Sequence, residues 1–159
     1  MLEGAKRCRL LISVLGIATA TCLAVGCGSS NGSFGSAALS KPEYIERAEA
    51  ICTKINREAE AAATAWKKEF PGGAAEAEKH PDDGLRKVLI PALEREADQL
   101  EALVPPTGHE AVVASFVENL SQANKALREQ GFKALPRSGA IDFKREAAAY
   151  GLKSCGKVL

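Results

Sequence analysis

Apolar residues recur every three or four positions along most of the chain, and this spacing constrains the fold more than any other feature. Between residues 40 and 70 they stand at Ile45, Ala48, Cys52, Ile55, Ala59, Ala62 and Trp66. Because an α-helix has about 3.6 residues per turn, these side chains share one face that packs against neighbouring helices. No segment competes with the period of two that is typical of a strand. The sequence therefore predicts an all-α fold.

The first helix begins and ends at clear local signals. Residues 40–43 read Ser-Lys-Pro-Glu, so Ser40 and Glu43 form a capping box and the proline fits the first turn. Pro-Gly-Gly at 71–73 predicts that the helix ends after Phe70.

The second helix is expected from Pro81 or Asp82 to Leu103. Pro91 lies inside it, removes a backbone hydrogen bond, and predicts a kink near residues 87–90. The apolar face consists of Leu85, Leu89, Ala92, Leu93, Leu100 and Leu103. We assign three acidic residues of this helix to a solvated face that also contains Arg95 and Lys87. These acidic residues are Glu94, Glu96 and Glu101.

Two further helices complete the domain. The third is expected to start at a second capping box, residues 107–110, and to stop at Gly131. The fourth is short, from about Ala140 to Tyr150. Short connections favour antiparallel neighbours, so we expect an up-down-up-down four-helix bundle with a short fourth helix. That short helix leaves the Trp66–Phe70 end with only two covering partners.

The first 26 residues have the layout of a signal peptide. Lys6, Arg7 and Arg9 precede a run from Leu10 to Val25 that has neither charge nor proline. The run is 16 residues long, whereas a spanning helix needs roughly 20. We therefore expect an export signal; the alternative is an uncleaved transmembrane anchor.

The end of this run, Leu-Ala-Val-Gly-Cys at 23–27, resembles the lipobox of bacterial lipoproteins. The resemblance implies cleavage after Gly26 and a diacylglyceryl thioether on Cys27. The protein would then sit on the extracytoplasmic face of a bacterial membrane through a lipid anchor. Two alternatives remain: secretion without a lipid after a cut near residues 18–20, and lipidation at Cys22.

The residues after Cys27 indicate a tether and then a domain. Residues 28–40 are rich in Gly and Ser and carry no charge, which is typical of a flexible linker. The expected organisation is a signal peptide at 1–26, a lipid-anchored linker at 27–39 and a helical domain at 40–159.

The five cysteines can be assigned by elimination. Cleavage removes Cys8 and Cys22, and lipidation uses Cys27. Cys52 and Cys155 remain, and an even number in an oxidising compartment predicts a disulfide. The alternative is two unrelated buried thiols.

Composition and motifs give no support for catalysis. Lys and Arg (21) balance Asp and Glu (20), so no nucleic-acid surface is indicated. The histidines are His80 and His109, and Ser115 lies a turn or more from His109. No nucleophile-elbow, zinc, haem, phosphate-loop or dinucleotide pattern is present. We therefore expect a protein that is not an enzyme and that has no cofactor and no metal site.

The mature chain as a whole resembles a loose group of small actinobacterial-type helical lipoproteins of unknown function. The matching stretches are Tyr44-Ile45 with Ala50-Ile51-Cys52, Leu103-Val104-Pro105-Pro106, and Ala149-Tyr150-Gly151-Leu152 with Cys155-Gly156. The resemblance implies a helical fold and a disulfide, and no activity.

Two hypotheses on function follow. The first is a non-enzymatic, membrane-anchored lipoprotein that presents its bundle to an unknown partner or serves envelope structure. The alternative is a carrier of a small apolar ligand in a pocket near Trp66 and Phe70.

Overall fold

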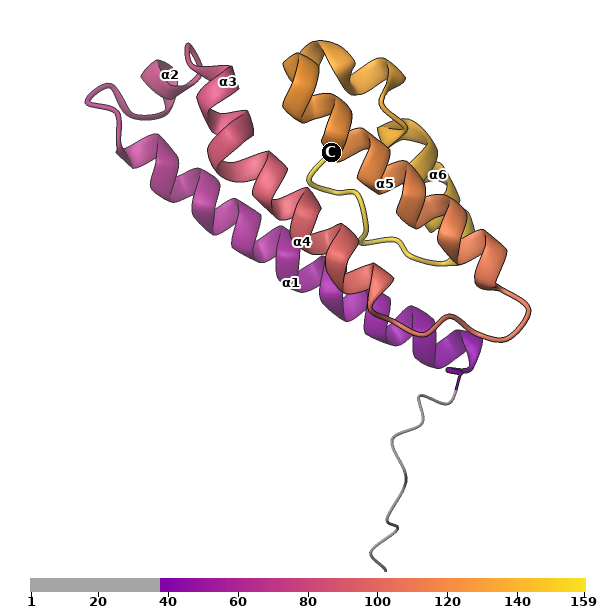
Figure 1. The fold of residues 1–159 in the computed structure, drawn as a ribbon. Helices are drawn as coiled ribbons and strands as arrows, with labels where there is room; N and C mark the ends of the chain where they lie inside the picture. The colour runs from indigo at the N-terminus through magenta and orange to yellow at the C-terminus, as the bar shows by residue number, and fades with distance from the viewer. Residues whose placement is uncertain (1–37) are drawn as a thin grey trace, which may run out of the picture. The chain divides into compact units, whose positions relative to one another are not determined.

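The computed structural model describes residues 38–159, and it is built from helices, turns and an irregular C-terminal segment (Figure 1). The α-helices and two tighter or wider helical segments are α1 Lys41–Lys68, α2 Gly73–Ala77, α3 Pro81–Gly84, η1 Leu85–Leu89, α4 Ile90–Glu101, α5 Glu110–Gln130, η2 Gly131–Arg137 and α6 Ala140–Tyr150. No strand occurs between residues 38 and 159, so the all-α prediction is confirmed there. The signal peptide, Cys27 and most of the linker lie outside the described residues.

Helix α1 begins at the predicted capping box. The Glu43 amide donates to the Ser40 hydroxyl at 3.4 Å, and the Ser40 amide donates to the Glu43 carboxylate at 2.9 Å. The hydrogen bonds from Ser40 hold the pKa of Glu43 below its ordinary value. The helix ends at Lys68, two residues before the predicted end at Phe70.

The predicted second helix is divided where Pro91 disturbs its hydrogen bonds. Because Pro91 has no N–H, the carbonyl four residues before it receives no helical donor. Just before this point the backbone hydrogen bonds join residues five apart instead of four. The Ile90 amide donates to the Leu85 carbonyl, and Leu85–Leu89 forms a π-helical turn. The irregularity is thus confirmed in position, and its form is a π-turn between α3 and α4.

The second capping box does not form, and that prediction is wrong. Helix α5 begins at Glu110 with His109 at the N-cap and no side-chain cap. Glu110 is therefore the first helical residue, too early to reach back across a full turn. The backbone amides of Glu110 itself and of Gly108 lower the pKa of its carboxyl.

The later boundaries match the expectation. Gly131 ends α5 with a φ of 68°, in the left-handed region that glycine adopts without steric cost. Helix α6 spans Ala140–Tyr150 as predicted. The short segments α2 and η2 had no counterpart in the sequence analysis.

The long helices pack side by side around one core. Helix α4 lies against α1 on one side and α5 on the other, while α6 packs on α5 and η2. The ring of Tyr150, at the end of α6, lies edge-on to Tyr44 near the start of α1, with ring centres 5.9 Å apart. Fully buried side chains of the core include Phe116, Phe143 and Leu120.

Residues 152–159, called here the C-terminal strap, run through the middle of the fold. The chain leaves α6 at Gly151, whose φ of 120° turns it inward. In Figure 1 the strap lies between the α1–α4 pair and the α5–α6 pair. Leu152 and Cys155 are buried along it, so the strap supplies part of the core.

Within the described part of the chain, no helix is sufficiently long and apolar to span a membrane.

Candidate functional site

The two cysteines left by elimination form a disulfide that joins α1 to the strap. Cys52 and Cys155 have Cα atoms 4.9 Å apart, inside the range of disulfides. Both residues are buried, with 0% and 3% of their surface exposed. The predicted pairing is confirmed, and it closes a loop over a sequence separation of 103.

Hydrogen bonds hold the strap on both sides of this disulfide. The Asn56 side-chain amide donates to the Ser154 carbonyl at 2.8 Å, and the Ser154 amide donates to the Glu49 carboxylate at 2.9 Å. On the α4 side, the Gly156 amide donates to Glu96 Oε1 at 3.1 Å. The strap is therefore attached to both α1 and α4.

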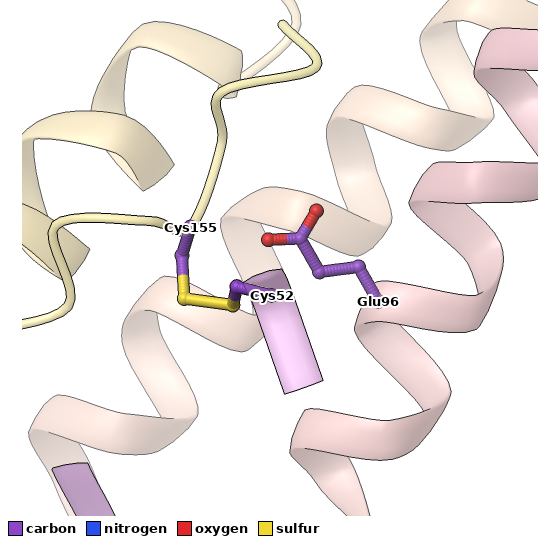
Figure 2. A group of neighbouring side chains, drawn as sticks. All are labelled: Cys52, Glu96 and Cys155. Carbon is purple, nitrogen blue, oxygen red and sulfur yellow. A yellow bond between two sulfur atoms is a disulfide. The ribbon is translucent and has the colours of Figure 1, made fainter. Parts of the chain in front are cut away.

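Glu96 is fully buried beside the disulfide, so its assignment to a solvated face is wrong (Figure 2). The strap covers the part of α4 that the sequence analysis left to solvent. Oε2 of Glu96 has no hydrogen-bond partner among the described residues. Burial raises the pKa of Glu96 to about 7, against the smaller opposing effect of the Gly156 amide. A signal existed in the sequence: Glu96 lies three residues after Leu93 and four before Leu100, on the apolar stripe.

Cys52, Glu96 and Cys155 place potential metal-ligand atoms within 4.8 Å of one another. Metals bind the thiolate form of cysteine, and here the two sulfurs are bonded to each other. This cluster is therefore a disulfide with a buried carboxyl neighbour.

A second feature is an apolar cavity farther along α1, on the same face as Cys52, called here the Trp66 groove. Its volume is about 520 Å³, within the roughly 300–1,000 Å³ of small-molecule sites. Most of its lining side chains are apolar. From α1 come Asn56, Ala59, Glu60, Ala63 and Trp66; the rest are Ala77, Glu78, Pro81, Gly84, Leu85, Val88, Leu89, Phe132, Lys157 and Val158.

Trp66 is fixed in the wall of this groove by a hydrogen bond and by a close approach to glycine. Its indole N–H donates to Asp83 at 2.8 Å, and this bond is the main cause of the lowered pKa of Asp83. The ring lies so near Gly84 that a Cβ there would stand 2.8 Å from it. Only glycine at position 84 leaves room for the indole in this orientation.

Phe70, the other predicted ligand contact, has a different place. Its ring packs edge-on against Trp66, with centres 5.5 Å apart, and stacks on His80 at 5.1 Å. Phe70 is not among the residues that line the groove. It supports Trp66 from behind, so the structure brings Trp66 alone of this pair to the cavity.

A second cavity, also of about 520 Å³, lies near the start of α5 and contains His109, Ser115, Glu146 and Tyr150. The Ser115 hydroxyl donates to Glu146 at 2.9 Å, and Asn119 donates to the same oxygen at 3.1 Å. His109 packs edge-on against the Tyr150 ring, with centres 5.6 Å apart. The serine proton thus points to a carboxylate rather than to the imidazole of a Ser–His pair.

Comparison of this chain with protein-family models, curated proteins and solved structures found no match. The resemblance to small helical lipoproteins therefore stays a prediction from the sequence.

Proposed function

We propose that this protein is a membrane-anchored lipoprotein whose helical bundle binds a small apolar ligand in the Trp66 groove. The anchor is the lipid on Cys27, and the linker at 27–39 connects it to the domain on the extracytoplasmic side. We also propose that α1, the α3–α4 segment, α5 and the short α6 run up-down-up-down as a four-helix bundle. In this proposal the protein binds its ligand and has no catalytic role.

The groove is the observation that carries the proposal. It combines a volume of about 520 Å³ with walls of small and aliphatic side chains. Ala59 and Ala63 lie one turn apart on α1, and their small side chains leave the space of the groove open. Leu85 and Val88 form the facing wall. Because each buried methylene contributes about 0.8 kcal/mol, such walls favour an apolar ligand.

The groove can be tested by filling it. Ala63→Phe places a ring in the cavity, whereas Ala61→Phe places the same ring on an exposed position of α1 that does not line it. Protein extracted from its own membranes is examined by native mass spectrometry. We expect a non-covalent small molecule on the wild type and on Ala61→Phe, and its loss in Ala63→Phe. Empty wild-type protein, together with Trp66 fluorescence that apolar compounds leave unchanged, would favour a protein-binding or envelope role instead.

The anchor is tested separately. Cys27→Ser should release the protein from washed membranes, while Cys22→Ser should leave it bound. Retention of Cys27→Ser in the membrane fraction would contradict the lipid anchor and favour an uncleaved span.

A further inference from the structure

The charged residues around the Trp66 groove are few and come from different parts of the chain. Glu60 lies on α1, Glu78 follows α2, and Lys157 lies on the strap; all three are exposed. None of them forms an ion pair with another residue in the range 38–159. The rim therefore carries two unpaired carboxylates and one ammonium group.

The three charges are distributed along the length of the groove. Asn56 and Trp66 mark its two ends on α1 and are ten residues apart, which corresponds to about 15 Å along the helix. Lys157 belongs to the Asn56 end, because Asn56 is hydrogen-bonded to the strap at Ser154. Glu78 belongs to the other end, where α2 and α3 lie at the end of α1 (Figure 1).

The Trp66 end therefore combines a carboxylate with an aromatic side chain, and Glu60 adds a second carboxylate between the ends. An indole attracts a cation more strongly than the other aromatic rings do. Among the lining residues, an anionic head group would find one cation, Lys157, and would be repelled by both glutamates. Lys87 lies close to the Trp66 end, but its ammonium group is already paired with Asp83 and Glu69. The charges of the rim are thus complementary to a cation.

We propose that the ligand of the Trp66 groove is an amphiphilic cation. Its apolar body lies on the alanine floor, and its ammonium-type head lies near Glu78 and Glu60. This inference rests on the proposed function, because it specifies the chemistry of a ligand in the same groove.

The proposal is tested with three probes that share a dodecyl chain and differ only in the head group: dodecyltrimethylammonium, dodecanol and dodecanoate. Each is titrated, below its micelle concentration, into the full chain carrying Cys27→Ser, so that no acyl anchor competes. Trp66 is the single tryptophan, so its fluorescence reports on the groove directly. We expect the cation to bind most tightly, the alcohol next and the anion least.

Two variants assign the preference to the carboxylates. Glu60→Gln and Glu78→Gln should each weaken binding of the cation by roughly two- to fivefold, the range of exposed ion pairs, and leave dodecanol unchanged. Glu46→Gln removes an equally exposed charge of α1 that does not line the groove, and should change neither. Added salt should reduce the preference, because exposed charges are screened.

The outcomes separate the two proposals. Dodecanol binding with no advantage for the cation, or with the anion preferred, overturns the cation inference and leaves the groove as an apolar site. If none of the three probes binds, the proposed function itself is wrong.

Discussion

The buried carboxyl of Glu96 makes the stability of the domain depend on pH in a direction that can be worked out. The pKa of Glu96 is raised from its ordinary value of 4.5 to about 7 in the folded protein, because burial disfavours the charged form. The folded state therefore binds more protons than the unfolded state between these two values. By linkage, the contribution of Glu96 to the free energy of unfolding is fully present below pH 4.5 and is lost as pH rises through about 7.

The size of the effect follows from the same two values. Moving a pKa from 4.5 to about 7 corresponds to about 3 kcal/mol in total. Part of this is already lost at pH 5, so about 2 to 3 kcal/mol should disappear between pH 5 and pH 8. Glu96→Gln keeps an oxygen that can accept from the Gly156 amide and has no charge to bury. This variant should be slightly more stable than the wild type at pH 5 and clearly more stable at pH 8.

Urea unfolding followed by circular dichroism measures this directly, at pH 5, 6, 7 and 8 with constant ionic strength and the disulfide intact. Glu101→Gln is the matched control, because Glu101 lies on the same helix but is exposed; its stability difference from wild type should not follow the same pH curve. The reasoning is refuted if the difference between Glu96→Gln and wild type is the same at pH 5 and pH 8.

Three other perturbations test the same structure. Replacing both Cys52 and Cys155 by Ala opens a loop closed over 103 residues, and chain entropy predicts a loss of about 4 to 5 kcal/mol in the free energy of unfolding; a loss below 1 kcal/mol in urea would contradict it. Gly84→Ala brings a methyl group within 2.8 Å of the Trp66 ring and should cost about 1 to 3 kcal/mol, with a shifted fluorescence maximum; unchanged fluorescence and stability would show that the ring moves freely. Ser40→Ala removes the α1 cap and should cost about 1 kcal/mol, measured by thermal unfolding; no loss would mean that the cap contributes nothing.

The helix boundaries could be predicted from the sequence because each one depends on a few residues that are close together in the chain. The capping box at Ser40 works through residues three apart, and the glycine at 131 ends α5 through its own φ. The irregularity before Pro91 also follows from one residue and its missing N–H. The failure at residues 107–110 has a local cause as well. His109 takes the N-cap, which makes Glu110 the first helical residue instead of the third that a capping box requires.

The site was predictable only in part, because its residues meet through the strap. Assigning the cysteines by elimination predicted the Cys52–Cys155 pair. The short fourth helix predicted that the Trp66 end would be incompletely covered. Glu96 was missed because a carboxylate on an otherwise apolar stripe was assigned to solvent. The groove lining was missed in detail because Gly84 and Val158 carry no chemical signal of their own.

The strap gives a physical reason for a buried glutamate at position 96, where an apolar side chain could otherwise pack. Gly156 stands one residue after Cys155, and its amide needs an acceptor once the disulfide holds the strap against α1. An unsatisfied buried amide costs about 1 to 3 kcal/mol, comparable to the cost of keeping the Glu96 carboxyl buried. Glu96 supplies that acceptor from α4, while Lys157 and Val158 continue directly into the wall of the Trp66 groove. The position of the groove wall is thus set by the same attachments that hold the strap in the core: the disulfide and the hydrogen bonds of Ser154 and Gly156.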